Sequence, residues 1–123
     1  MPVATTSAQF FLGGIDKAKK LLLDAFLHDV KVATMPASVG TVGTTSSTIL
    51  AANQHRVYTI ITNTSDTDID IAFGETAVSG RGVRIVCNGG TYTIDWTNLW
   101  QGAVNAICAA ANKNVAIVDG RTD

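Results

Sequence analysis

One stretch, residues 49–74, restricts the fold of this chain more than any other, because a strand-like run, a polar turn and a second strand-like run follow one another there. The polar turn covers residues 63–67, and apolar residues then alternate with polar or small ones over residues 68–73. Such alternation is typical of a strand with one buried face. We therefore predict a β-hairpin of a half-buried antiparallel sheet, with Asp68 and Asp70 on its solvent face.

The composition indicates an ordered protein. Of the 123 residues, 46% are hydrophobic and 15% are charged, which is far from the composition of disordered chains. A chain of this length forms one ordinary domain, or a small domain with an appendage. The net charge of −1 provides no basic field to neutralise phosphates, so we expect no binding to nucleic acid.

The C-terminal two thirds of the chain carry short β-rich runs separated by turn signals. This spacing predicts a mainly β fold, a compact antiparallel β-sandwich or barrel of about seven strands over residues 47–123. The strands are expected at about 47–52, 56–63, 68–73, 82–87, 91–96, 103–109 and 114–119.

The N-terminal part has a helical period instead. Its apolar stripe consists of Ile15, Ala18, Leu22, Ala25, Phe26 and Val30. The spacing predicts an amphipathic helix at about 15–32, halted before Pro36, within an N-terminal arm of residues 1–36. Residues 37–46 are rich in Gly, Thr and Ser and are expected to form a linker.

The same N-terminal part lacks the features of a targeting segment. Its leader has no basic n-region, and the apolar arc at residues 21–27 is shorter than the roughly 20 residues that cross a bilayer. We expect synthesis in a cytoplasm and no membrane partner. The width of the apolar stripe exceeds what a monomer of this size should expose, which predicts a homo-oligomer.

Several residue types that could carry chemistry do not form a recognisable site. Asp66, Asp68 and Asp70 have the opening spacing of a calcium loop, but Ile71 stands where the loop needs Gly and Ala77 where it needs Glu. We therefore predict no metal site.

The cysteines, histidines and glycines also favour structural roles. Cys87 and Cys108 lie in apolar runs, which favours two reduced, packed thiols over a disulfide. His28 and His55 belong to no nucleophile pattern, so we expect neither an enzyme nor a cofactor. The segment Gly80-Arg81-Gly82 precedes a strand and is expected to serve a turn.

The two tryptophans, Trp96 and Trp100, flank the short segment Thr97-Asn98-Leu99. By the period of a strand, Trp96 shares a face with Tyr92, which predicts Trp96 in the core and Trp100 as a contact residue. The alternative is a sugar-stacking platform formed by these three aromatic residues, as in a carbohydrate-binding module.

The amino-acid sequences of three segments resemble those of a known group of proteins. Residues 49–74 fit the pattern I-L-A-A-N…R…I-x-N-x-S-D-T-D-I-x-I-x-F-G, residues 82–92 are similar to G-I-R-L…G-G-x-Y, and residues 102–118 are similar to G-A-V-N-A-I…V-x-V. These patterns resemble the β-domain of small tailed-bacteriophage virion proteins. The likeness covers roughly residues 46–120, and the arm carries no matching motif.

The resemblance implies a virion structural protein without enzymatic activity, made in the host cytoplasm and located on the outer capsid surface. It implies a capsid cement or decoration protein, with a head-fibre base or a tail accessory protein as the alternative. The implied partners are the major capsid protein and further copies of the chain, as a homotrimer. The residues expected at the capsid or subunit interface are Phe10, Phe11, Ile15, Leu22, Phe26, Val30 and Trp100.

Overall fold

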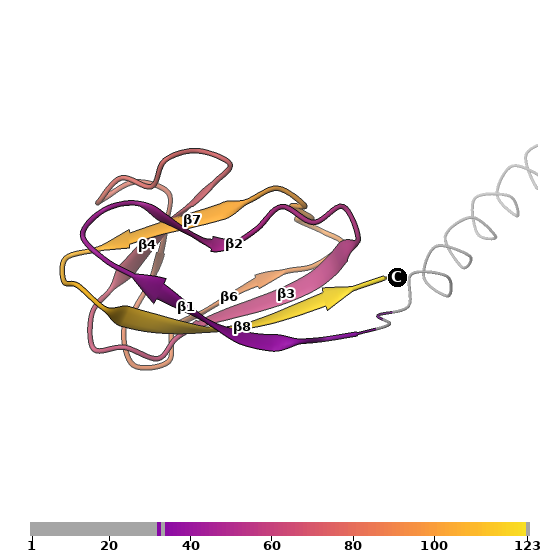
Figure 1. Cartoon of the computed structure of the whole chain (residues 1–123), viewed down its shortest axis with the longest axis horizontal. Helices are drawn as coiled ribbons and strands as arrows, with labels where there is room; N and C mark the ends of the chain where they lie inside the picture. The colour runs from indigo at the N-terminus through magenta and orange to yellow at the C-terminus, as the bar shows by residue number, and fades with distance from the viewer. Residues whose placement is uncertain (1–31, 33, 123) are drawn as a thin grey trace, which may run out of the picture. The chain divides into compact units, whose positions relative to one another are not determined.

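The computed structural model describes Val32 and residues 34–122, which form an all-β body of two packed antiparallel sheets (Figure 1). The eight strands are β1 (Ala37–Val42), β2 (Ser47–Leu50), β3 (Arg56–Asn63), β4 (Ile69–Phe73), β5 (Val83–Ile85), β6 (Thr91–Ile94), β7 (Val104–Cys108) and β8 (Lys113–Arg121). Sheet A has the order β1-β8-β3-β6 and sheet B the order β2-β7-β4-β5. The predicted antiparallel sandwich is confirmed, and the predicted helix lies outside the described residues.

The core lies between the two sheets and is built from alternate residues of each strand. Isoleucine and valine dominate it because β-branched side chains suit a pleated, buried surface. The buried members are Val42, Leu50, Ile61, Ile69, Ile71, Ile85, Ile94, Val104, Ala106, Cys108, Val115 and Ile117.

The expected linker at residues 37–46 is wrong, because its first six residues form β1. This strand pairs with β8 without a register shift, from Ala37 opposite Val118 to Val42 opposite Lys113. Val42 is fully buried. The Gly and Thr content indicated flexibility, but the backbone pairing and the burial of Val42 outweigh this local preference. The seven predicted strands correspond to β2 through β8.

The predicted hairpin is also wrong, since β3 and β4 belong to different sheets and the turn between them crosses the sandwich. Buried Asn63 holds this crossing. Its amide nitrogen donates to the carbonyl oxygens of Thr67 at 2.8 Å and Ile85 at 2.9 Å, and its Oδ1 accepts from the amide of Ser65 at 2.9 Å. Alternation indicates that each strand has one buried face, but it does not identify the strand's partner.

A buried arginine joins the end of sheet A to the neighbouring loops. The Arg56 side chain is fully buried, and its guanidinium donates to Asp119 Oδ1 at 3.0 Å and to the carbonyl oxygens of Trp100, Gly102 and Ala51. Thr59 donates to the same Asp119 oxygen at 2.7 Å. A buried charge is tolerated only when it is paired and hydrogen-bonded, and Arg56 meets both conditions.

Candidate interaction surface

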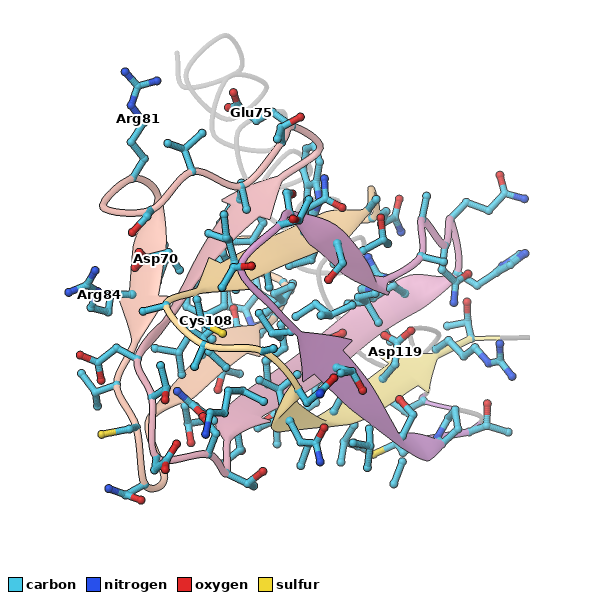
Figure 2. All side chains as sticks on the ribbon, turned by 60° about the vertical axis from the view of Figure 1, so that its left-hand side comes forward. Asp70, Glu75, Arg81, Arg84, Cys108 and Asp119 are labelled. Carbon is cyan, nitrogen blue, oxygen red and sulfur yellow. The ribbon has the colours of Figure 1, made fainter. Side chains whose placement is uncertain are left out.

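The three aspartates with calcium-like spacing point to three different partners. Asp66 forms an ion pair with Lys113 at 2.7 Å, and Asp68 accepts the backbone amide of Cys87 at 2.9 Å. Asp70 lies on the outer face of its sheet, as predicted, but it is only 5% exposed, so the expectation of a solvated side chain is wrong. Arg84 of the neighbouring strand β5 covers it with bonds of 2.9 and 3.1 Å, and the two side chains lie together in Figure 2.

The pairing with Arg84 predicts how acid affects stability. The Arg84 hydrogen bonds hold the pKa of Asp70 below its ordinary value, against the opposing effect of burial, and the Gly80 amide adds to the lowering. A depressed pKa in the folded state stabilises the protein above the unfolded pKa, near 4, and this contribution is lost as the pH falls through the folded value. Asp70→Asn should therefore lower the urea midpoint at pH 7 and lose less stability than the parent between pH 5 and 2.

The matched control for this prediction is Asp66→Asn, because Asp66 pairs with Lys113 on the open surface, where ion pairs contribute little. It should leave the urea midpoint at pH 7 nearly unchanged. An Asp70→Asn protein as acid-sensitive as the parent would contradict the role assigned to the Asp70 pair.

Cys87 and Cys108 are both free cysteines. Cys108 is buried, and its thiol donates to the carbonyl oxygen of Ala110. Cys87 is half-buried, and desolvation, together with a hydrogen bond to Asp68, raises the pKa of its thiol. Raised pKa values disfavour the nucleophilic thiolate. The expectation of a packed thiol is met fully by Cys108 and partly by Cys87.

The environments of the two tryptophans are the reverse of those predicted, which were the core for Trp96 and a contact surface for Trp100. Trp96 is 64% exposed, whereas Trp100 is half-buried, donates its indole N–H to Ala103 at 2.9 Å and meets the Phe73 ring edge-on. Tyr92 packs against the other side of this cluster, with its ring centre 5.5 Å from that of Phe73. The loop after β6 departs from strand geometry, so the period of two does not extend to Trp96. Of the three residues of the predicted sugar-stacking platform, Trp96 is exposed, whereas Tyr92 and Trp100 are half-buried.

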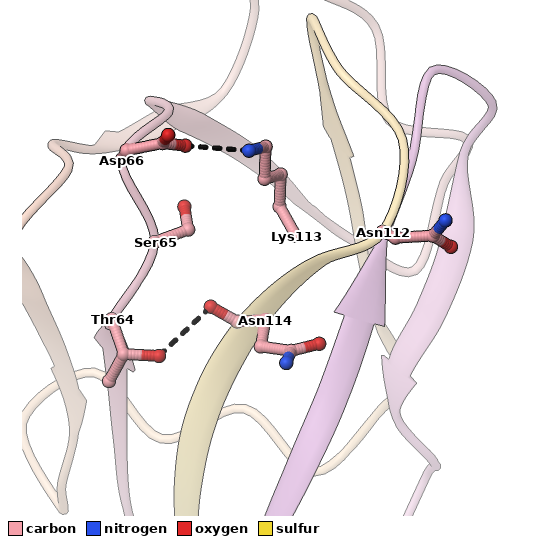
Figure 3. Close-up of a pocket in the computed structure, with 6 residues that line it drawn as sticks. All are labelled: Thr64, Ser65, Asp66, Asn112, Lys113 and Asn114. Atoms are coloured by element: carbon pink, nitrogen blue, oxygen red, sulfur yellow. Dashed lines mark hydrogen bonds and ion pairs between the residues drawn. The ribbon is translucent and has the colours of Figure 1, made fainter.

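The turns at one end of the sandwich border a shallow polar hollow of about 300 Å³ (Figure 3). It is lined by Thr64, Ser65, Asp66, Asn112, Lys113 and Asn114. Its polar groups bond to one another: Asp66 pairs with Lys113, and Thr64 donates to the carbonyl oxygen of Asn114 at 3.1 Å. These bonds join the turn after β3 to the beginning of β8 at this end of the sandwich.

The outer face of sheet A is the surface that stands out chemically. Its outward positions follow from the register, because they alternate with the buried residues of the same strands. None of them is charged. They are Ala37, Val39 and Thr41 of β1; Asn114, Ala116, Val118 and Gly120 of β8; Tyr58, Ile60 and Thr62 of β3; and Thr91 and Thr93 of β6.

The centre of this face is apolar and its far end is polar. Val118 lies between Ala37 and Ile60 on the neighbouring strands, and Val39 on the edge strand is 68% exposed. At one end, Thr41 bonds to Asn114 at 3.5 Å. Exposed apolar side chains that gather on one face are a mark of interaction sites.

The outer face of sheet B differs in kind. It carries the ion pair of Asp70 with Arg84 and the hydrogen bond of 2.7 Å between Thr48 and Asn105. Asn105 donates a further bond of 2.7 Å to the carbonyl oxygen of Glu75. The polar groups of this face satisfy one another and are suited to water, so the outer face of sheet A is the better candidate for a partner.

The chain enters the body over the outer face of sheet A. Thr34 bridges to Arg121 in antiparallel fashion, and a Cβ added at outward-facing Gly120 would lie 3.1 Å from Val32 and 3.4 Å from Met35. Both of these apolar side chains are nearly half exposed, at 41% and 46%. They extend the apolar centre of the face toward the end opposite Thr41 and Asn114.

Most of the interface residues predicted from the sequence, from Phe10 to Val30, lie outside the described part of the chain, and Trp100 packs against the core. The outer face of sheet A was not predicted, because β1 was taken for a linker. The alternation of Val39, Thr41 and their neighbours in Ala-Ser-Val-Gly-Thr-Val was the available signal.

Within residues 34–122, no three His, Cys, Asp or Glu side chains gather closely enough to hold a metal ion. The same part of the chain contains no helix that is long and apolar enough to span a bilayer. A scan against protein-family models, a search of curated proteins and a search of solved structures find no match to this chain.

Proposed function

We propose that this chain is a non-enzymatic structural protein of a bacteriophage virion, a cement or decoration protein that binds the head shell. A head-fibre base or a tail accessory protein is the alternative within the same class. In this proposal the protein is made in the host cytoplasm, acts on the outer capsid surface and has the major capsid protein and its own copies, as a homotrimer, as partners.

The proposal is supported by the structural roles of the residues in the three sequence patterns that resemble phage virion proteins. Asn63 holds the crossing between the sheets, Arg56 joins strands and loops, and Asp70 and Arg84 pair across β4 and β5. Gly82 takes a positive φ of 79°. The patterns are thus made of residues that fix the architecture, as expected of a group that shares a rigid body and not a reaction.

A second group of pattern residues supports the same interpretation. A Cβ at Gly102 would collide with the Trp100 ring, and one at Gly90 would lie 2.3 Å from the carbonyl oxygen of Val86. Asn105 bonds to Thr48 and to the carbonyl oxygen of Glu75. Each of these residues holds a turn or a strand edge in place, which suits a body exposed to the environment on a particle surface.

The test is binding of the purified full chain to capsids that lack it, followed by sedimentation. We expect the variant Leu22→Asp/Phe26→Asp to bind at least tenfold more weakly, because a charge on the predicted apolar stripe opposes its burial. The control Lys20→Gln/His28→Asp makes the same change in net charge off the stripe and should bind like the parent. If the parent does not bind capsids, the decoration role is wrong; if the stripe variant binds equally well, the arm is not the contact.

A further inference from the structure

We propose that the outer face of sheet A is the surface through which copies of this chain pack against one another. This deepens the proposed function by naming the subunit interface, and it rests on that function only for the number of copies. The occupant is a second copy of the same chain, and three observations support this choice.

The first observation is the charge of the face. Copies related by a symmetry axis bring identical groups together around that axis, so a charged group near the axis meets its own kind. The outward positions of sheet A carry no charged side chain, and four of their polar side chains bond in pairs, Thr41 with Asn114 at 3.5 Å and Thr62 with Thr91 at 3.4 Å. Nothing in this face repels a second copy of itself.

The second observation is the area that the face offers. Four strands about 4.8 Å apart, each contributing about 20 Å of length, give a flat area of roughly 400 Å². A stable interface usually buries about 800 Å² of accessible surface on each partner. The accessible surface of a sheet studded with side chains such as Val39 and Ile60 exceeds its flat area, and Val32 and Met35 extend it further. The face therefore supplies a large share of a stable interface.

The third observation is where the rest of the chain is attached. Residues 1–31 join the body at Val32, whose side chain lies over Gly120 on this same face. Copies that meet through sheet A therefore bring Val32, the residue at which residues 1–31 are joined to the body, to one interface.

The edge strand β1 gives a further reason why a second copy would cover this side of sheet A. Strand β1 is an edge strand of six residues with no charge, no proline and no register shift. The edges of sheet B are protected differently: β2 has a register shift, and β5 has three residues and carries Arg84. An open, regular, uncharged edge invites uncontrolled pairing, and a defined neighbour across the adjoining face limits access to it.

The experiment is sedimentation equilibrium of the purified full chain at concentrations from 1 to 100 µM, in the absence of capsids. We expect the parent to associate, and Val39→Lys and Val118→Lys to raise the dissociation constant at least tenfold. Val39 is exposed enough to accept lysine without loss of the fold. The control Ile107→Lys places the same charge at a half-buried outward position on the middle strand β7 of sheet B and should associate like the parent.

Circular dichroism melts of all variants establish that each one is folded before it is compared. A parent that stays monomeric at every concentration would overturn the proposal, as would a folded Val39→Lys variant that associates like the parent. Loss of association in Ile107→Lys equal to that in Val118→Lys would move the interface to another surface. Failure of capsid binding with self-association intact would contradict the decoration role alone.

Discussion

Replacing Arg56 with methionine is expected to destabilise the sandwich by about 3–5 kcal/mol, the cost of breaking a buried ion pair by removing one partner. The methylene stem would be kept, but the carboxylate of Asp119 would lose its cation and three carbonyl oxygens would lose a donor. A domain of this size has only about 5–15 kcal/mol of total stability. We therefore expect a large fall of the urea midpoint, measured by tryptophan fluorescence.

Arg84→Met is the matched control, because Arg84 also pairs with an aspartate through its guanidinium but has a side chain that is 53% exposed. Its removal leaves Asp70 with the Gly80 amide as a donor at 2.8 Å. Ion pairs with an exposed partner contribute little to stability, so we expect a much smaller loss than in Arg56→Met. Equal losses of stability in the two variants would show that the burial of Arg56 does not determine its contribution.

Gly82→Ala is expected to cost about 2–5 kcal/mol, because two penalties act at one position. The residue has φ of +79°, in the left-handed region, and an added Cβ would lie 2.1 Å from the carbonyl oxygen of Ile71. That oxygen belongs to β4, the strand with which the following strand β5 pairs. The left-handed conformation costs about 1–2 kcal/mol and overpacking about 1–3 kcal/mol. Chemical denaturation measures the loss.

Gly80→Ala separates the two penalties. Gly80 has a nearly identical φ of +82°, but an added Cβ would meet nothing within 4 Å. Only the left-handed conformation then opposes alanine, at about 1–2 kcal/mol. If Gly80→Ala and Gly82→Ala are equally destabilised, the close approach to Ile71 is relieved by movement of the loop, and the β5 edge is less rigid than its geometry implies.

The strands were predictable because apolar and polar residues alternate along a strand that has one buried face. The run from Arg56 to Asn63 was predicted with its observed bounds, since turn residues flank it on both sides. The pairing was not predictable, because a strand with one buried face can join either sheet. The crossing from one sheet to the other at Asn63 depends on a hydrogen bond to the carbonyl oxygen of Ile85, which is 22 residues away in sequence.

The role of Arg56 was missed for a different reason. Alternation back from buried Thr59 and Ile61 would turn Val57 inward and Arg56 outward. A register shift between Arg56 and Tyr58 reverses this, and Arg56 faces the interior. Such bulges redirect a side chain without leaving a signal in the pattern of apolar residues.

The candidate face combines a predictable part with an unpredictable one. Val118 and Ile60 lie in strands that were predicted, so their alternation with core residues could be read from the sequence. That they are neighbours, and that β1 adds Val39 beside them, depends on pairing between residues near the two ends of the described body, which only the three-dimensional arrangement provides.

The position of β8 has a consequence for how the protein is made. This last strand lies between β1 and β3, and its partners precede it by more than fifty residues in the chain. Ribosomes add about 5–20 residues per second, so the first strands wait several seconds for the strand that joins them. Sheet A can therefore close only after β8 has been synthesised, and a message cut short before Lys113 would yield a product in which β1 and β3 both lack β8 as a partner, prone to aggregation and to proteolysis.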